Sequence, residues 1–175
     1  LVDKSFNTIS IESLIIDASL WSVLIGVPGS GKTSSLKWLL QQVCFEHITD
    51  YEYAIYISLY DLEKYLKNYP NSSLFSCFFQ IYLGHKPNDA ENLGRLLENA
   101  ITRQEFSVLF LFDGLDEVSP EFRGTIIKHI KRKLSNEKVI ITSRPSAYNK
   151  ISRLETTSFY RIISLPHTSI KRLVT

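Results

Sequence analysis

Short runs of consecutive apolar residues alternate along the chain with longer segments in which apolar residues recur every three or four positions. Most of the short runs are apolar throughout, which is typical of strands in a parallel sheet that is covered on both faces. From this pattern we expect five strands: Ser22–Ile25, Tyr53–Leu59, Ser107–Phe112, Lys138–Thr142 and Tyr160–Leu165.

The longer segments carry the periodicity and start signals of helices. One helix is expected from Lys32 to about Phe45. A second is expected to have Asp89 as its N-cap, and a third is expected to start at Ser119, with Pro120 at its first position. The residues expected on the buried faces of the second and third helices are Leu93, Leu96, Leu97 and Ala100, and Phe122, Ile126, Ile127, Ile130 and Leu134. Alternating strands and helices predict a three-layer α/β sandwich with right-handed crossovers.

Composition narrows the class of protein. The chain of 175 residues fits one domain, and its 44% hydrophobic content is ample for a core. A net charge of +2 argues against bulk electrostatic capture of nucleic acid or of a membrane surface. Cys44 and Cys77 form no CxxC pair, and we expect both to be small buried groups in a reducing cytosol. Because the chain begins at Leu1 and contains no methionine, we expect it to be a fragment of a longer protein.

The stretch GVPGSGKTS, residues 26–34, follows the first expected strand and fits the phosphate-loop pattern GxxxxGK[ST]. Gly29 and Gly31 allow backbone N–H groups to wrap around an anion at the start of the next helix. Lys32 can reach the outer phosphates, and the Thr33 hydroxyl can bind Mg²⁺. A glycine-rich turn with no ligand is the competing interpretation, and the strand-loop-helix context argues against it.

Two further polar segments follow apolar strands. Asp113 ends the run at 107–112, where a carboxylate needs a compensating charge, and we interpret it as a direct or indirect Mg²⁺ ligand. Asp116 and Glu117 could polarise the attacking water, although Asp116 could also only cap a helix. Arg144 follows the run at 138–142 and could sense a phosphate. A surface arginine in a loop is the alternative for that position.

Together these three segments resemble the NACHT family, within the signal-transducing P-loop ATPases with numerous domains. GVPGSGKTS matches its first motif, LFLFDGLDEV its extended second motif and VIITSRP its sensor strand, in the same order. The resemblance extends over roughly Ser22 to Pro166. It implies the P-loop NTPase fold, with a mainly parallel five-stranded sheet in the order 5-1-4-3-2. It also implies a lead-in segment at 1–20, a core at 21–166 and the start of a further helical domain at 167–175.

The family further implies a cytoplasmic, ATP-dependent signalling switch of the kind used in innate immunity. Such a switch binds ATP or ADP with Mg²⁺, assembles as a homo-oligomer in its ATP state, and works with flanking sensor and effector domains. Carried over to this chain, Thr33 and Asp113 hold the metal, Glu117 or Asp116 activates water, and Arg144 is the sensor. The residues expected to contact nucleotide are Gly26, Val27, Pro28, Gly29, Ser30, Gly31, Lys32, Thr33 and Ser34.

Two other function classes stay open at this point. A small-molecule or nucleoside kinase would share the phosphate loop, but no arginine-rich lid segment is visible. A module that uses nucleotide only as a structural clamp is disfavoured by the two acids at 116 and 117. The basic residues at 128–133 are interpreted as a solvated helix face instead of a nucleic-acid site. Ser72–Leu83 is expected to be a deeply packed helix or, alternatively, a surface that further domains cover.

Overall fold

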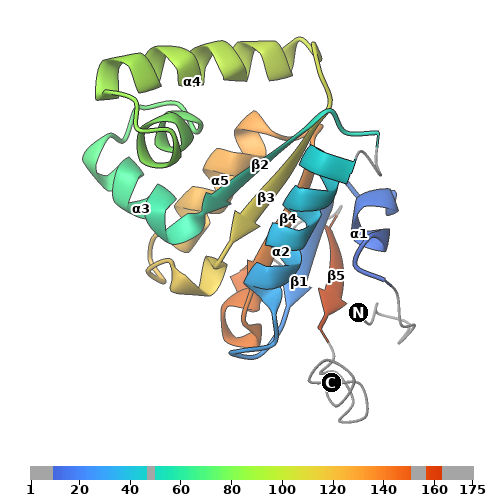
Figure 1. Ribbon diagram of the computed structural model, residues 1–175. Coiled ribbons are helices and arrows are strands. Elements are labelled where there is room, and N and C mark those ends of the chain that lie inside the picture. Colours follow the sequence, from blue (N-terminus) through green and yellow to red (C-terminus); the bar gives the residue numbers. More distant parts are fainter. Residues whose placement is uncertain (1–9, 47–49, 151–156, 163–175) are drawn as a thin grey trace, which may run out of the picture.

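The computed structural model of the protein describes residues 10–46, 50–150 and 157–162 (Figure 1). Its centre is a five-stranded parallel sheet in the order β2-β3-β4-β1-β5. The strands are β1 (Trp21–Ile25), β2 (Tyr53–Ser58), β3 (Val108–Asp113), β4 (Lys138–Ser143) and β5 (Thr157–Arg161). This confirms the expected α/β class and strand order. β3 and β4 are buried along their whole length, as continuous apolar runs predict.

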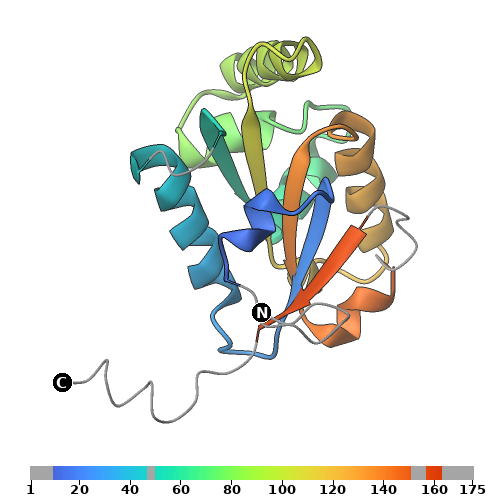
Figure 2. The same ribbon diagram turned by 90° about the vertical axis from the view of Figure 1, so that its right-hand side faces the viewer.

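Helices cover both faces of the sheet (Figures 1 and 2). On one face lie α1 (Ser13–Ile16) and α2 (Lys32–Gln41), which a π-helical turn (Gln42–Glu46) extends. On the other face lie α3 (Leu59–Asn68) and α5 (Arg123–Lys133), with α4 (Pro87–Thr102) farther out. Two hydrophobic clusters result, one on each side of the sheet. In the described parts of the chain, no helix has both the length and the apolar character that crossing a bilayer requires.

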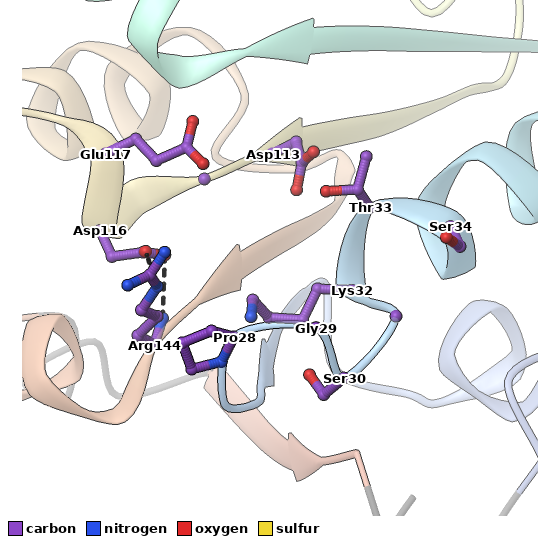
Figure 3. A pocket seen from close by; sticks show the side chains of 12 residues that line it. Pro28, Gly29, Ser30, Lys32, Thr33, Ser34, Asp113, Asp116, Glu117 and Arg144 are labelled. Atoms are coloured by element: carbon purple, nitrogen blue, oxygen red, sulfur yellow. Dashed lines mark hydrogen bonds and ion pairs between the residues drawn. The ribbon is translucent and has the colours of Figure 1, made fainter. Parts of the chain in front are cut away.

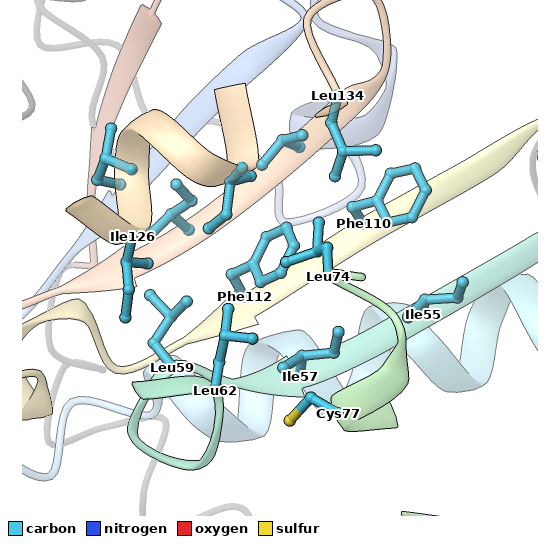
Figure 4. Packing of buried hydrophobic residues seen from close by; sticks show 14 of the residues in the cluster. Ile55, Ile57, Leu59, Leu62, Leu74, Cys77, Phe110, Phe112, Ile126 and Leu134 are labelled. Carbon is cyan, nitrogen blue, oxygen red and sulfur yellow. The ribbon is translucent and has the colours of Figure 1, made fainter. Parts of the chain in front are cut away.

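The larger cluster lies under α3 and α5. Phe110 and Phe112 of β3 are fully or almost fully buried there, together with Leu59 and Leu62 of α3 and Ile126 of α5 (Figure 4). Burying a side chain of this size contributes about 1.5–3 kcal/mol. Because alternate residues of β3 face opposite sides, Leu109 and Leu111 pack under α2 instead, and Asp113 continues on that side. The strand therefore delivers its terminal carboxylate to the face that carries the phosphate loop.

The prediction of which face of α4 is buried is partly wrong. The helix begins at Pro87, with Asp89 in its first turn and not at the N-cap. Its buried residues are Ala90, Gly94 and Ile101, whereas Leu96 is 64% exposed. The cause is close packing against the helical turn that contains Ser76, since a Cβ at Gly94 would lie 2.7 Å from the Ser76 backbone nitrogen.

Two other boundaries differ from expectation. α5 begins at Arg123, because the Ser119 carbonyl first accepts the Phe122 and Arg123 N–H groups in a separate turn. The last strand begins three residues early, at Thr157, and the predicted residues 163–165 lie outside the described part of the chain. The expected domain start at 167–175 also lies outside it.

The segment at 72–83 is only half buried, so the deeply packed helix expected there is wrong. Leu74, Phe75 and Cys77 are buried, but the π-helical turn Phe78–Tyr82 has no buried residue, and Leu83 is 54% exposed. Cys44 is exposed, contrary to expectation.

Candidate active site

The phosphate-loop residues 26–34 connect the carboxyl end of β1 to the first turn of α2. Gly29 and Gly31 have φ angles of +72° and +91°, which side chains with a Cβ rarely adopt. Gly26 is favoured for a different reason, because a Cβ there would lie 2.2 Å from the Ser30 hydroxyl oxygen, which would have to move. The loop glycines therefore allow positive φ angles at two positions and close packing against Ser30 at a third.

The charged and hydroxyl groups of the loop have defined positions. Lys32 Nζ donates hydrogen bonds to the carbonyls of Gly26 at 2.9 Å and Val27 at 3.0 Å. Thr33 and Ser34 stand in the first turn of α2, and Figure 3 shows Thr33 turned toward Asp113.

Beside the loop is a cavity of about 300 Å³. Its walls are the loop residues 28–34 and the side chains or backbone of Asp113, Gly114, Asp116, Glu117 and Arg144. Lys32 and Asp113 therefore line one cavity, although Lys32 begins the helix after β1 and Asp113 is the last residue of β3. Gly26 and Val27, also expected to contact nucleotide, are not part of this lining, and their carbonyls hold Lys32 instead.

Asp113 is held from both neighbouring strands. Its Oδ1 accepts a hydrogen bond of 2.5 Å from Thr142 Oγ1 on β4, and its Oδ2 accepts one of 2.9 Å from Tyr56 Oη on β2. Thr142 Oγ1 in turn accepts the Gly114 N–H at 2.8 Å. Burial raises the pKa of Tyr56, and the Asp113 charge raises it further, so the phenol is neutral and donates.

Sequence reasoning missed both of these hydroxyl groups. Thr142 gave a signal, since it is a polar residue at the end of the apolar run Val139–Ile141. Tyr56 gave none, because a tyrosine inside a strand is an ordinary choice for a half-buried position. Only the alignment of β2 with β3 shows that its hydroxyl reaches the carboxylate.

The acidic segment after β3 is braced from two helices. Gly114 has a φ of +81° and opens a short 3₁₀ turn, Leu115–Glu117. The guanidinium of Arg123 in α5 donates to the carbonyls of Val118 at 3.0 Å and Asp116 at 2.9 Å. From α3, the buried carboxylate of Glu63 accepts hydrogen bonds from the Ser119 backbone N–H, at 2.9 Å, and from its hydroxyl. These contacts fix the turn that carries the two candidate catalytic acids.

Asp116 and Arg144 form a two-point pair at the edge of the cavity. Arg144 Nε lies 2.7 Å from Asp116 Oδ2, and the Arg144 backbone N–H donates to Oδ1 at 3.0 Å (Figure 3). Asp116 thus ties the end of β4 to the turn after β3 instead of capping a helix. Arg144 is half exposed and lines the cavity.

Glu117 differs from its neighbour. Among the described residues, no hydrogen bond or ion pair engages its carboxylate, and a Cβ added at Gly114 would lie 3.0 Å from its Oε2. Burial raises the pKa of Glu117, and the charges of Asp116 and Asp113 raise it further, whereas those of Arg144 and Lys32 act in the opposite direction. A carboxylate with a raised pKa and no fixed partner has the properties of a general base.

Comparison with known proteins gives a family and a fold. The family model for the NACHT domain matches residues 20–175. No significant match was found among curated proteins.

Two solved structures resemble the chain with a TM-score of 0.50: PCH-2 of C. elegans and the ORC1 protein of Aeropyrum pernix in complex with DNA. Identity is 16% over 91% of this chain for the first and 12% over 88% for the second. The chain spans 42% of the length of each, and at such identities the likeness concerns the fold alone. With a phosphate loop after β1 and a parallel β2-β3-β4-β1-β5 sheet, the fold is that of the P-loop NTPases, and the chain belongs to the NACHT family.

Proposed function

We propose that this chain is the ATP-binding, slowly hydrolysing switch module of a larger cytoplasmic signalling or defence protein. One observation carries the proposal: Lys32 of the phosphate loop and Asp113 of the acidic segment line the same cavity, with Glu117 and Arg144 at its edge. A phosphate-binding half and a metal-binding half in one cavity are the parts that nucleotide hydrolysis needs. Because the chain belongs to the NACHT family, the proposal also includes homo-oligomerisation in the ATP state and flanking sensor and effector domains in the larger protein.

The residues present fit a nucleotide phosphate and its cation. A Cβ added at Gly29 or Gly31 would meet no atom within 4 Å, and both glycines line the open cavity together with Lys32. Thr33 and Asp113 offer hydroxyl and carboxylate oxygens to one cavity, the donor set that Mg²⁺ prefers. When bound, Mg²⁺ neutralises charge on the phosphate oxygens.

The protein's own groups account for the remaining chemistry. Glu117 accepts a proton from the water whose oxygen attacks the γ-phosphorus, while the bond from that phosphorus to the bridging oxygen breaks and ADP leaves. Asp116 is a poorer base, because both of its oxygens are engaged by Arg144. Lys32 and the loop N–H groups bind the phosphates, and Arg144 is the group that can respond to the γ-phosphate.

Nucleotide binding and turnover test this proposal. The chain is titrated with ATP, ADP and GTP in the presence of Mg²⁺, and phosphate release is followed without any acceptor molecule. We expect binding of ATP and ADP together with slow phosphate release. Binding without turnover would favour a nucleotide-clamped interaction module, and release that requires an added acceptor would favour a kinase. No binding of any nucleotide would refute the proposal.

A further inference from the structure

We propose that Tyr56 is a positioning residue that fixes the Asp113 carboxylate for the nucleotide-bound Mg²⁺. The inference rests on the proposed function and assigns a role to a residue outside the phosphate loop and the acidic segment. Tyr56 does not line the cavity, and it acts only through its hydrogen bond to Asp113.

The sheet explains how Tyr56 reaches this carboxylate. In the β2–β3 register, Ser58 is the residue directly opposite Asp113, and Tyr56 lies two positions earlier on the same strand. Tyr56 is therefore a diagonal neighbour of Asp113, and an aromatic side chain is long enough to reach a diagonal position. Tyr56 packs on the face under α2, the same face to which Asp113 belongs. A hydroxyl at the end of a rigid ring is therefore delivered to Oδ2.

The two hydroxyls hold the carboxylate from opposite sides. β2 and β4 flank β3, so Tyr56 and Thr142 approach Asp113 from its two neighbouring strands, one to each oxygen. A carboxylate has about four acceptor positions, and this clamp uses two of them. The remaining two can serve the metal or its waters, in a carboxylate plane that no longer rotates freely. Outer partners of this kind orient metal-binding carboxylates and tune their affinity.

A second tyrosine keeps the ring of Tyr56 in place and provides a matched control. The Tyr82 ring lies edge-on to Tyr56, with centroids 6.5 Å apart and an interplanar angle of 88°. Its hydroxyl accepts the Ser58 N–H at 2.9 Å and donates to Asp61 at 3.2 Å, so it does not engage Asp113. Removing either phenol oxygen is the same chemical change, but only one of the two contacts the carboxylate.

The experiment measures the Mg²⁺ dependence of nucleotide affinity in the wild-type chain, Tyr56→Phe and Tyr82→Phe. ADP is titrated in EDTA and at increasing Mg²⁺ concentrations, and thermal unfolding confirms that each variant is folded. In Tyr56→Phe we expect the Mg²⁺ concentration for half of the affinity gain to rise by about tenfold or more, with unchanged affinity in EDTA. Tyr82→Phe is expected to match the wild type in both measurements.

Each other outcome overturns the inference, and the outcomes separate it from the proposed function. If Tyr56→Phe keeps the wild-type Mg²⁺ dependence, Tyr56 does not position Asp113, while the proposed function stands. Equal weakening with and without Mg²⁺ would mean that the hydroxyl supports the fold alone. Should the wild-type chain bind no nucleotide in either condition, both the function and the inference fall.

Discussion

Replacing Glu117 by Gln removes one charge and leaves the size and shape of the side chain unchanged. Positioned general bases contribute about 10²–10⁴-fold to rate, so we expect phosphate release at saturating Mg-ATP to fall by that factor. The upper part of the range applies here, because Arg144 engages both oxygens of Asp116 and leaves that carboxylate unable to substitute. Nucleotide affinity should be retained or slightly increased, since a negative charge facing the phosphates is lost.

The same substitution should stabilise the folded chain at neutral pH. The pKa of Glu117 is raised on folding, so its ionised form costs free energy above that pKa, and this cost disappears as pH falls through it. Glu117→Gln should therefore unfold at a higher temperature than the wild type at pH 7 and lose this advantage in acid.

The matched control is Asp116→Asn, which removes a charge one residue away and breaks the ion pair with Arg144. It should lower stability by about 1 kcal/mol, the upper end of the range for surface ion pairs, because only Arg144 of this pair is half exposed, and it should reduce turnover less than Glu117→Gln does. Turnover of Glu117→Gln within about threefold of wild type would refute Glu117 as the base, since a base contributes at least about 10².

Three further predictions follow from the site and the fold. Lys32→Ala should weaken ATP binding by about 10- to 150-fold, the equivalent of 1.5–3 kcal/mol for a charged hydrogen bond, as calorimetry would measure. Turnover should fall in acid as Glu117 is protonated. Arg144→Ala should move this acidic limb of the pH–rate profile to higher pH, because the Arg144 charge lowers the pKa of Glu117. An acidic limb at the wild-type pH would contradict this prediction. In urea unfolding, Gly94→Ala should lower the stability of the chain by about 1–2 kcal/mol, because overpacking outweighs the gain in helix propensity. Gly124→Ala is the control: the space around Gly124 is open, so this substitution should raise the stability by about 0.4–1 kcal/mol.

Much of the fold could be predicted, because continuous apolar runs report burial on both faces of a parallel sheet. The interior strands at 108–113 and 138–143 are predictable almost to the residue for that reason. The buried face of α4 is not, because leucine periodicity reports which face could be buried, while the close approach at Gly94 decides which face is. The prediction for residues 72–83 fails for a related reason, because apolar content alone does not distinguish a π-helical turn at the surface from a buried helix.

The candidate site is predictable where function requires a local pattern. The phosphate loop and the acidic segment each carry their chemistry in consecutive residues, so both can be recognised, although the roles assigned to them stay predictions. The contacts that arrange them join residues far apart in the chain: Tyr56 with Asp113, Glu63 with Ser119, and the fixed pairing of Asp116 with Arg144. Strand register creates the first of these contacts and the packing of helices and loops creates the other two, so no short window of the sequence reveals them.

The pairing of β1 has a consequence for how the protein acquires its site during synthesis. β1 precedes the other four strands along the chain, yet its two neighbours in the sheet, β4 and β5, come after β2 and β3. Pairings of such high sequence separation form slowly, because the loop they close must be ordered first. The strand that carries the phosphate loop therefore gains its two partners only after β4 and β5 have been synthesised, and termination before β4 would leave β1 without either of them.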